Sequence, residues 1–183
     1  MSGNHASWAI KGTDILTELV AMMGVTAEEA AVLAVLQPQA KAVSRQMTAD
    51  FYVRLRAHSA TLEYLQGASD ERLNSMLADW FTDLFSGKYD EAYATHRLGI
   101  GAIHVRIGLP VRYPLAMLDA IMPYGEQTAA KSPQPEVALR AFRKVLALDV
   151  ALFNQAYEND QLHHLSDLVG GERLARLLLT GGM

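Results

Sequence analysis

One histidine of this sequence stands among apolar residues at helical spacing, where an imidazole is able to bind a metal ion. His104 has Ile100, Ile103 and Ile107 as its neighbours at this spacing, so its ring is expected to project from the buried side of a helix. A histidine in such a place is either a core residue hydrogen-bonded to a carbonyl or an axial metal ligand beside a flat apolar cofactor. Spacing and composition alone favour the core residue.

Two further features favour the cofactor. Gly99 and Gly101 lie in the same helix, each at a cost of about 1 kcal/mol relative to alanine, and small residues there would allow a large group or another helix to approach closely. An amphipathic segment upstream has no ionisable residue on its inward stripe, as the wall of a cofactor slot would. That stripe consists of Leu73, Met76, Leu77, Trp80, Phe81, Leu84 and Phe85.

Tyr52 is the third candidate, because it follows Phe51 at the edge of another apolar stripe. A tyrosine at a buried edge needs a partner for its hydroxyl group. That partner is either a backbone carbonyl or a polar ligand in an apolar pocket, where a single donor is worth more than in water. The spacing of the residues leaves these alternatives open.

The remaining histidines are interpreted as solvated surface residues, and other common motifs do not occur. Gly99-Ile-Gly101 lacks the third glycine and the preceding strand of a dinucleotide loop. The sequence contains no P-loop, no nucleophile elbow and no zinc motif of the His-Glu-x-x-His type. The histidines expected at the surface are His5, His58, His96, His163 and His164.

Composition limits the classes of function. A chain of 183 residues with 50% hydrophobic residues suits a single globular domain. The formal charge of −4 gives no electrostatic footprint for nucleic acid, and no apolar run is long enough to span a membrane. Cysteine is absent, which excludes disulfides and thiolate metal sites and fits the cytoplasm that we expect.

Helical periodicity extends through nearly the whole sequence and predicts an all-α domain of about seven or eight helices. Thr26 and Glu29 form a capping box, Pro38 is expected to end the helix that this box opens, and Asp70 is expected to cap a later helix. Pro123 is expected to kink the helix that contains it. The expected helices cover residues 14–23, 27–36, 39–57, 71–86, 89–107, 111–131 and 135–160, with a further helical stretch in 161–183 interrupted at Gly170-Gly171.

These residues together resemble the sensor globins, which are the haem domains of globin-coupled sensors, and the related protoglobins. The most specific string runs from Arg97 to Leu109 and reads R-x-x-I-G-x-x-H-x-R-I-G-L. Phe51-Tyr52, Phe85-Ser-Gly87 and Tyr89-Asp90 precede it in the family's order. The resemblance extends from about residue 13 to about residue 157.

The resemblance implies a globin fold of the sensor-globin type, with an extra N-terminal helix and long C-terminal helices that form a homodimer interface. It makes His104 the proximal ligand of the iron of haem b and Tyr52 the distal donor to bound O₂, with CO and NO as further ligands. Whether Met76, Asn74 or Leu77 occupies the position of a second distal contact stays open. The implied haem pocket contains Phe51, Leu73, Met76, Leu77, Trp80, Ile100, Ile103 and Ile107.

The function implied is a haem-based O₂ sensor that signals through a homodimer to an output domain, commonly a diguanylate cyclase or a chemotaxis transducer. We expect no enzymatic activity of the chain itself. The expected organisation is a tail over residues 1–12, a sensor domain over 13–160 and a helical linker over 161–183. The alternatives are a protoglobin-like redox protein of the NO dioxygenase type and a haemless globin-like interaction module, against which retention of His104 argues.

Overall fold

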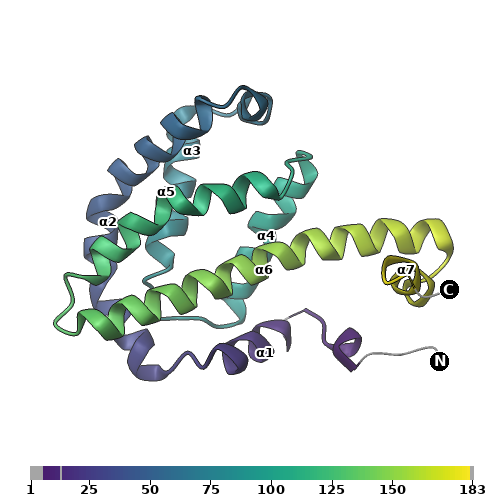
Figure 1. Ribbon diagram of the computed structural model, residues 1–183, viewed down its shortest axis with the longest axis horizontal. Coiled ribbons are helices and arrows are strands. Elements are labelled where there is room, and N and C mark those ends of the chain that lie inside the picture. Colours follow the sequence, from purple (N-terminus) through teal and green to yellow (C-terminus); the bar gives the residue numbers. More distant parts are fainter. Residues whose placement is uncertain (1–5, 13, 182–183) are drawn as a thin grey trace.

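The computed structural model describes residues 6–12 and 14–181, and within these residues the chain is helical, without strands (Figure 1). The prediction of an all-α domain is therefore confirmed. The helices are the 3₁₀ turn η1 (Ala6–Ala9), α1 (Asp14–Met23), α2 (Ala27–Arg56), the 3₁₀ segment η2 (Ser59–Leu65), α3 (Asp70–Asp83), α4 (Glu91–Arg106), α5 (Arg112–Ala129), α6 (Pro135–Val169) and α7 (Glu172–Leu179).

Helix α2 begins at the predicted capping box but does not end at Pro38. The backbone N–H of Glu29 donates to Thr26 Oγ1 over 3.1 Å, and the N–H of Thr26 donates to Glu29 Oε2 over 3.0 Å. The prediction of two helices separated by Pro38 is wrong, because α2 continues through this residue. Pro38 and Ala34 are both exposed, so the Ala34 carbonyl that loses its helical donor lies on the solvent side of the helix.

The ends of α3 and α4 lie within a few residues of the predicted positions. Ser69, and not Asp70, caps α3, and its hydroxyl accepts from the N–H of Arg72. The helix ends at Asp83, so Phe85 belongs to the turn that follows. Asp90 caps α4, and Gly108 adopts the left-handed conformation just after the end of that helix, with φ of +70°.

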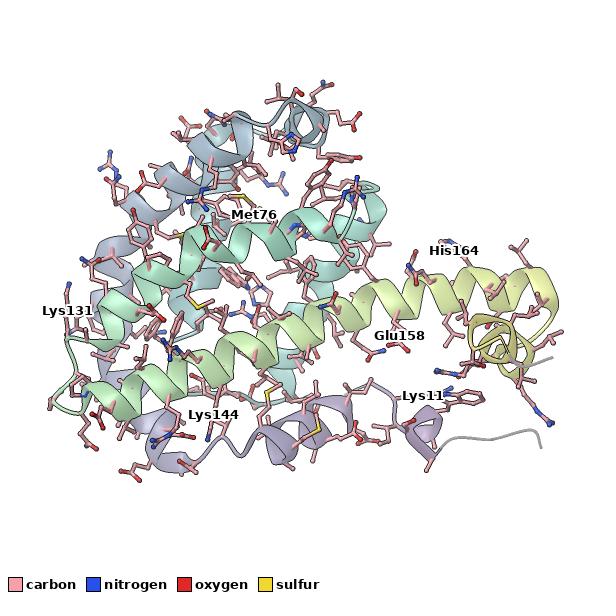
Figure 2. All side chains as sticks on the ribbon, viewed as in Figure 1. Lys11, Met76, Lys131, Lys144, Glu158 and His164 are labelled. Atoms are coloured by element: carbon pink, nitrogen blue, oxygen red, sulfur yellow. The ribbon has the colours of Figure 1, made fainter. Side chains whose placement is uncertain are left out.

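Helix α6 is longer than its sequence pattern predicts. It continues past residue 160 to Val169 and ends where Gly170 takes a φ of +81°. Helix α7 then folds back beside the end of α6, next to the N-terminal segment (Figure 1). Figure 2 shows Lys11 at this end, where its ammonium group lies 2.6 Å from the carboxylate of Glu172.

Helix α6 contributes to both buried clusters of the molecule. One cluster packs α2, the end of α3, α5 and α6 together, and includes Leu36, Phe85 and Phe142. The other joins α1, α4 and α6 through Leu16, Tyr93 and Leu152. Because α4 also packs along α6, the long helix is the element against which the helix of His104 is positioned.

A Cβ atom on Gly125 would overlap the ring of Phe142, so α5 and α6 approach closely at this point. Helix α5 continues through Pro123 without interruption.

In the part of the chain that the structure describes, no single helix combines the length and apolar composition of a membrane span. Helices α1 and α2 meet both criteria only when taken together, across a bend of 99°.

Candidate functional site

His104 presents a neutral imidazole whose orientation is fixed by a backbone hydrogen bond. Its Nδ1 lies 2.8 Å from the carbonyl oxygen of Ile100. Because a carbonyl oxygen only accepts, Nδ1 carries the proton and Nε2 keeps a free lone pair. Burial lowers the pKa of His104 below its usual value, and the hydrogen bond to Ile100 opposes this shift only in part. The ring is therefore in the form that binds a metal ion through Nε2.

On α4, His104 lies between a buried side of the helix and a partly exposed side. Ile103 precedes it by one residue and Gly101 by three, so at about 100° per residue they lie on opposite sides of the histidine. Gly101 is buried against α6, whereas Ile103 is 42% exposed and Ile107 is 47% exposed. The isoleucine side of α4 is therefore only partly covered by protein, and the result is apolar surface beside the imidazole.

Helix α3 carries another exposed apolar residue of the predicted pocket. Met76 is 44% exposed, and Leu73 and Leu77 on the same helix are half-buried. Exposed apolar side chains on both α3 and α4 are what a flat apolar cofactor would cover.

Tyr52 is buried on α2 and its hydroxyl donates to the carbonyl oxygen of Leu73 on α3 over 3.1 Å. Of the two partners that the sequence left open, the backbone carbonyl is the one in this structure. Phe51 packs edge to face against Tyr52, with 5.2 Å between the ring centres. Burial raises the pKa of Tyr52 to about 12, so the hydroxyl keeps its proton and acts as a donor near neutral pH.

The predicted site residues thus form two groups. Tyr52, Phe51 and the residues of α3 lie together, and His104 lies with the isoleucines of α4. Among the described residues, no hydrogen bond or ion pair joins Tyr52 directly to His104.

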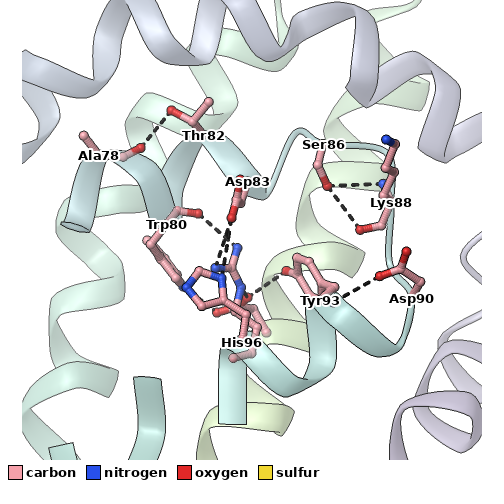
Figure 3. Close-up of polar contacts among 11 residues, drawn as sticks. Ala78, Trp80, Thr82, Asp83, Ser86, Lys88, Asp90, Tyr93 and His96 are labelled. Atoms are coloured by element: carbon pink, nitrogen blue, oxygen red, sulfur yellow. Dashed lines mark hydrogen bonds and ion pairs between the residues drawn. The ribbon is translucent and has the colours of Figure 1, made fainter. Parts of the chain in front are cut away.

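A buried polar cluster near His104 was missed by sequence reasoning (Figure 3). Asp149 of α6 accepts hydrogen bonds from Tyr93 Oη at 2.7 Å and from Trp80 Nε1 at 2.8 Å. Arg97 of α4 places its Nε 2.5 Å from the same carboxylate and donates through its terminal nitrogen to the Trp80 carbonyl over 3.1 Å. Trp80, which was predicted to line the pocket, takes part in these polar contacts through its indole N–H and its backbone carbonyl. A sequence signal existed, since Asp149 interrupts the apolar run 145–152.

Burial governs the electrostatics of this cluster. Arg97 is 1% exposed and Asp149 is 4% exposed. Burial raises the pKa of the Asp149 carboxyl, and the Arg97 guanidinium and the hydrogen bonds from Tyr93 and Trp80 oppose that rise. The guanidinium also lies over the ring of Tyr93, 4.5 Å from its centre.

The other described histidines lie at the surface, as predicted, and His5 lies outside the described residues. The side chains of His163 and His164 are 73% and 70% exposed and pair with separate carboxylates. His96 lies 3.7 Å from Asp83 and is 58% exposed. No group of three or more potential metal ligands occurs within the described residues.

A groove of about 500 Å³ between α1 and α6 lies apart from these residues and contains Met23 and Leu139. Its cations already have partners, since Arg140 and Lys144 pair with Glu29 and Arg143 pairs with Glu126. We therefore assign it no ligand.

The fold and the helix order are those of a globin domain. The structure matches the globin domain of the Geobacter sulfurreducens globin-coupled sensor with a TM-score of 0.71 and 26% sequence identity, over 77% of this chain and 96% of that chain. Residues 13–163 match the Protoglobin family, and the chain belongs to this family.

A curated relative gives the same result. The heme-based aerotactic transducer HemAT of Halobacterium salinarum is 27% identical over 159 residues, which are 79% of this chain. The chain spans about a third of the length of that relative, 32%.

Proposed function

We propose that this chain is a haem-binding gas-sensor domain in which His104 ligates the iron. The observation that carries the proposal is the state of the His104 side chain: a neutral imidazole with Nε2 free, beside the exposed apolar surface of Ile103 and Ile107. No group of three or more potential metal ligands occurs among the described residues, which suits an iron held by one protein imidazole, with its other ligands supplied by a porphyrin.

The residues present fit such a group. Met76 on α3 and the isoleucines on α4 offer apolar contact to its faces and edges, while Gly99 has open space where a Cβ would stand. When bound, haem would supply an iron that the imidazole of His104 could hold and that could bind a diatomic gas. The family match and the name of the HemAT relative support haem as the cofactor, and haem b is our proposal for its type.

Tyr52 is the residue that we assign to the gas. Its hydroxyl is neutral, buried and held by one hydrogen bond to Leu73. A small rotation of the side chain would exchange that carbonyl for a polar ligand, and a single donor in an apolar pocket stabilises the more polar ligand selectively. O₂ is therefore expected to gain more from Tyr52 than CO.

The output is proposed by analogy with the relatives. HemAT is named as a transducer, and the structural relative is the globin domain of a sensor. We propose that the chain forms a homodimer through its long C-terminal helices and signals to an output domain such as a chemotaxis transducer or a diguanylate cyclase. Sedimentation at increasing protein concentration tests the dimer, which a monomer at all concentrations would exclude.

The absorption spectrum of the purified protein tests haem binding. We expect a Soret band that responds to dithionite and then to CO, and we expect His104→Ala to abolish stable haem incorporation. His163→Ala is the matched control, because it removes an imidazole that is 73% exposed. A wild-type spectrum in the His104→Ala protein would exclude His104 as the ligand.

The ligand role of Tyr52 has its own test. In Tyr52→Phe we expect O₂ dissociation to accelerate by about tenfold, the equivalent of one hydrogen bond of roughly 1.4 kcal/mol, and CO dissociation to change much less. Tyr64→Phe, on the 3₁₀ segment η2, is the control. Equal acceleration for both gases would rule out a selective hydrogen bond.

A further inference from the structure

The ion pair between Arg97 and Asp149 joins the helix of His104 to the long helix α6. Arg97 precedes His104 by seven residues, which is two helical turns, so both lie on nearly the same side of α4. Arg97 Nε lies 2.5 Å from Asp149 Oδ1, and both side chains are almost fully buried. Neither residue is among those that we propose to contact haem. The position of Arg97 two turns before His104 on the same side of α4 therefore needs a separate explanation.

The ion pair is held from three helices. Trp80 of α3 donates its indole N–H to one oxygen of Asp149, and Tyr93 of α4 donates its hydroxyl to the other. Arg97 in turn donates to the backbone carbonyl of Trp80 and lies 3.7 Å from Asp83 of α3. Figure 3 shows Trp80 and Asp83 on one helix facing Tyr93 on the next. The carboxylate therefore has a fixed position with respect to α3, α4 and α6 together.

Between the ion pair and His104, α4 touches α6 through contacts without a preferred direction. A Cβ atom on Gly101 would stand 2.5 Å from Ala156 Cβ and 3.0 Å from the carbonyl oxygen of Phe153. The ring of His104 packs edge to face on Phe153, with 5.2 Å between ring centres. A glycine surface and an aromatic edge both tolerate a small slide or rotation, whereas a buried ion pair with hydrogen-bonded partners does not.

We propose that Arg97 and Asp149 are positioning residues that fix the register of α4 along α6 and thereby the direction in which His104 presents Nε2. This inference rests on the proposed role of His104 as the iron ligand. The ion pair acts at a distance of two turns, through the helix, and does not touch the imidazole.

The decisive variants separate charge from stability. Asp149→Asn keeps the size of the side chain but removes the charge that Arg97 faces. Its amide oxygen can accept from Trp80 Nε1, and its amide nitrogen can donate to Tyr93 Oη. Arg97→Lys keeps the charge but loses the fork of the guanidinium group. Leu152→Ala is the control for lost stability, since Leu152 is fully buried in the cluster that joins α4 and α6. Glu29→Gln is the control for a different buried carboxylate, which lies on α2 and pairs with Arg140 and Lys144 of α6.

The iron–histidine stretching band of the reduced protein, measured by resonance Raman spectroscopy, reports the strain and direction of the proximal bond. We expect the band to shift or broaden in Asp149→Asn and Arg97→Lys, and to stay at the wild-type position in the two controls. Transfer of haem to an apoglobin acceptor should accelerate by roughly tenfold in Asp149→Asn, the lower end of the range for residues that orient a ligand. An unshifted band in Asp149→Asn, or a shift in Leu152→Ala of equal size, would overturn the proposal.

Hydrogen exchange of the same full-length chains provides a readout that does not depend on iron. We expect faster exchange of the α4 amides in both charge variants than in Glu29→Gln. If wild-type protein binds no haem while these amides still lose protection, the proposed function has failed and the helix-positioning role stands. If Asp149→Asn does not fold, Arg97→Lys decides the question by the same two measurements.

Discussion

Two buried carboxylates form ion pairs that join α6 to another helix, but the surroundings of the two pairs are opposite. Glu29 at the start of α2 is 3% exposed and Asp149 in the middle of α6 is 4% exposed. The side chains of the cations that meet Glu29 reach the solvent, with Arg140 59% exposed and Lys144 28% exposed. The side chain of Arg97, which meets Asp149, is 1% exposed.

The pKa values of the two groups move in opposite directions as a result. Burial alone would raise the pKa of Glu29, but hydrogen bonds from Lys144, Thr26 and Arg140 leave it below its usual value. Burial raises the pKa of Asp149 in spite of Arg97 and two donors. The ion pairs of Glu29 therefore stabilise the fold through cations that keep much of their hydration. The pair of Asp149 with Arg97 is fully desolvated, and it gives a fixed geometry at a high cost in desolvation free energy.

Breaking the buried ion pair between Arg97 and Asp149 should have the largest effect on the free energy of unfolding. Asp149→Leu and Arg97→Met, made singly, each leave an uncompensated buried charge and should lower the free energy of unfolding by about 3–5 kcal/mol. The double variant should recover much of that loss, because it buries no charge. Urea unfolding followed by circular dichroism measures all three, and a double variant that loses the sum of both single effects would show that the pair is not coupled.

Removing the charge of Glu29 should cost less, about 1–2 kcal/mol, because Arg140 and Lys144 return to water and glutamine keeps the capping hydrogen bond to Thr26. The same urea titration gives the value. A loss as large as that of Asp149→Leu would mean that exposure of the cations does not matter.

Acid should act on the two sites with opposite sign. Glu29 has a folded-state pKa below its ordinary value of 4.5, so its contribution is complete above that value and is lost as the pH falls through the lower, folded pKa. Asp149 has a raised folded-state pKa, so the native state binds its proton more readily and acidification relieves a cost there. Glu29→Gln should flatten the fall of stability in acid, and Asp149→Asn should steepen it. Unfolding curves between neutral and acid pH measure both slopes.

The smallest effect is expected for Arg140→Gln. An ion pair with one largely exposed partner contributes less than about 1 kcal/mol, and salt should reduce this contribution further. The loss caused by Arg97→Met should barely depend on salt. Thermal melts at low and high sodium chloride test this contrast, which would fail if both variants responded to salt alike.

Structural features that depend only on residues close together in the chain could be predicted from the sequence. The capping box of Thr26 and Glu29, the end of α1 before Gly24 and the turn at Gly108 each depend on side chains or φ angles within a few residues. The prediction that Pro38 ends α2 was wrong, because a proline at a solvent-facing position costs only one hydrogen bond. The packing of α2 on its neighbours outweighs that loss.

The buried polar cluster around Asp149 could not be predicted, because its members are far apart in the sequence. Asp149 follows Arg97 by 52 positions, and only the fold brings them together. The exposure of Ile103 and Met76 could not be predicted either, since an apolar stripe looks the same in sequence whether protein or cofactor covers it. The roles of His104 and Tyr52 came from a resemblance and remain predictions.

Because α6 is long and unbroken, a small tilt at its contact with α4 becomes a large displacement of its C-terminal end. From Val137 to Val169 this helix contains neither glycine nor proline, so it has no built-in hinge between the contact with α4 and its end. Val169 lies 20 residues beyond Asp149, about 30 Å along the axis, so a tilt of about 5° at the contact would displace it by about 2.6 Å. A small tilt of α6 at its contact with α4 is therefore carried along the whole helix to its end before Gly170.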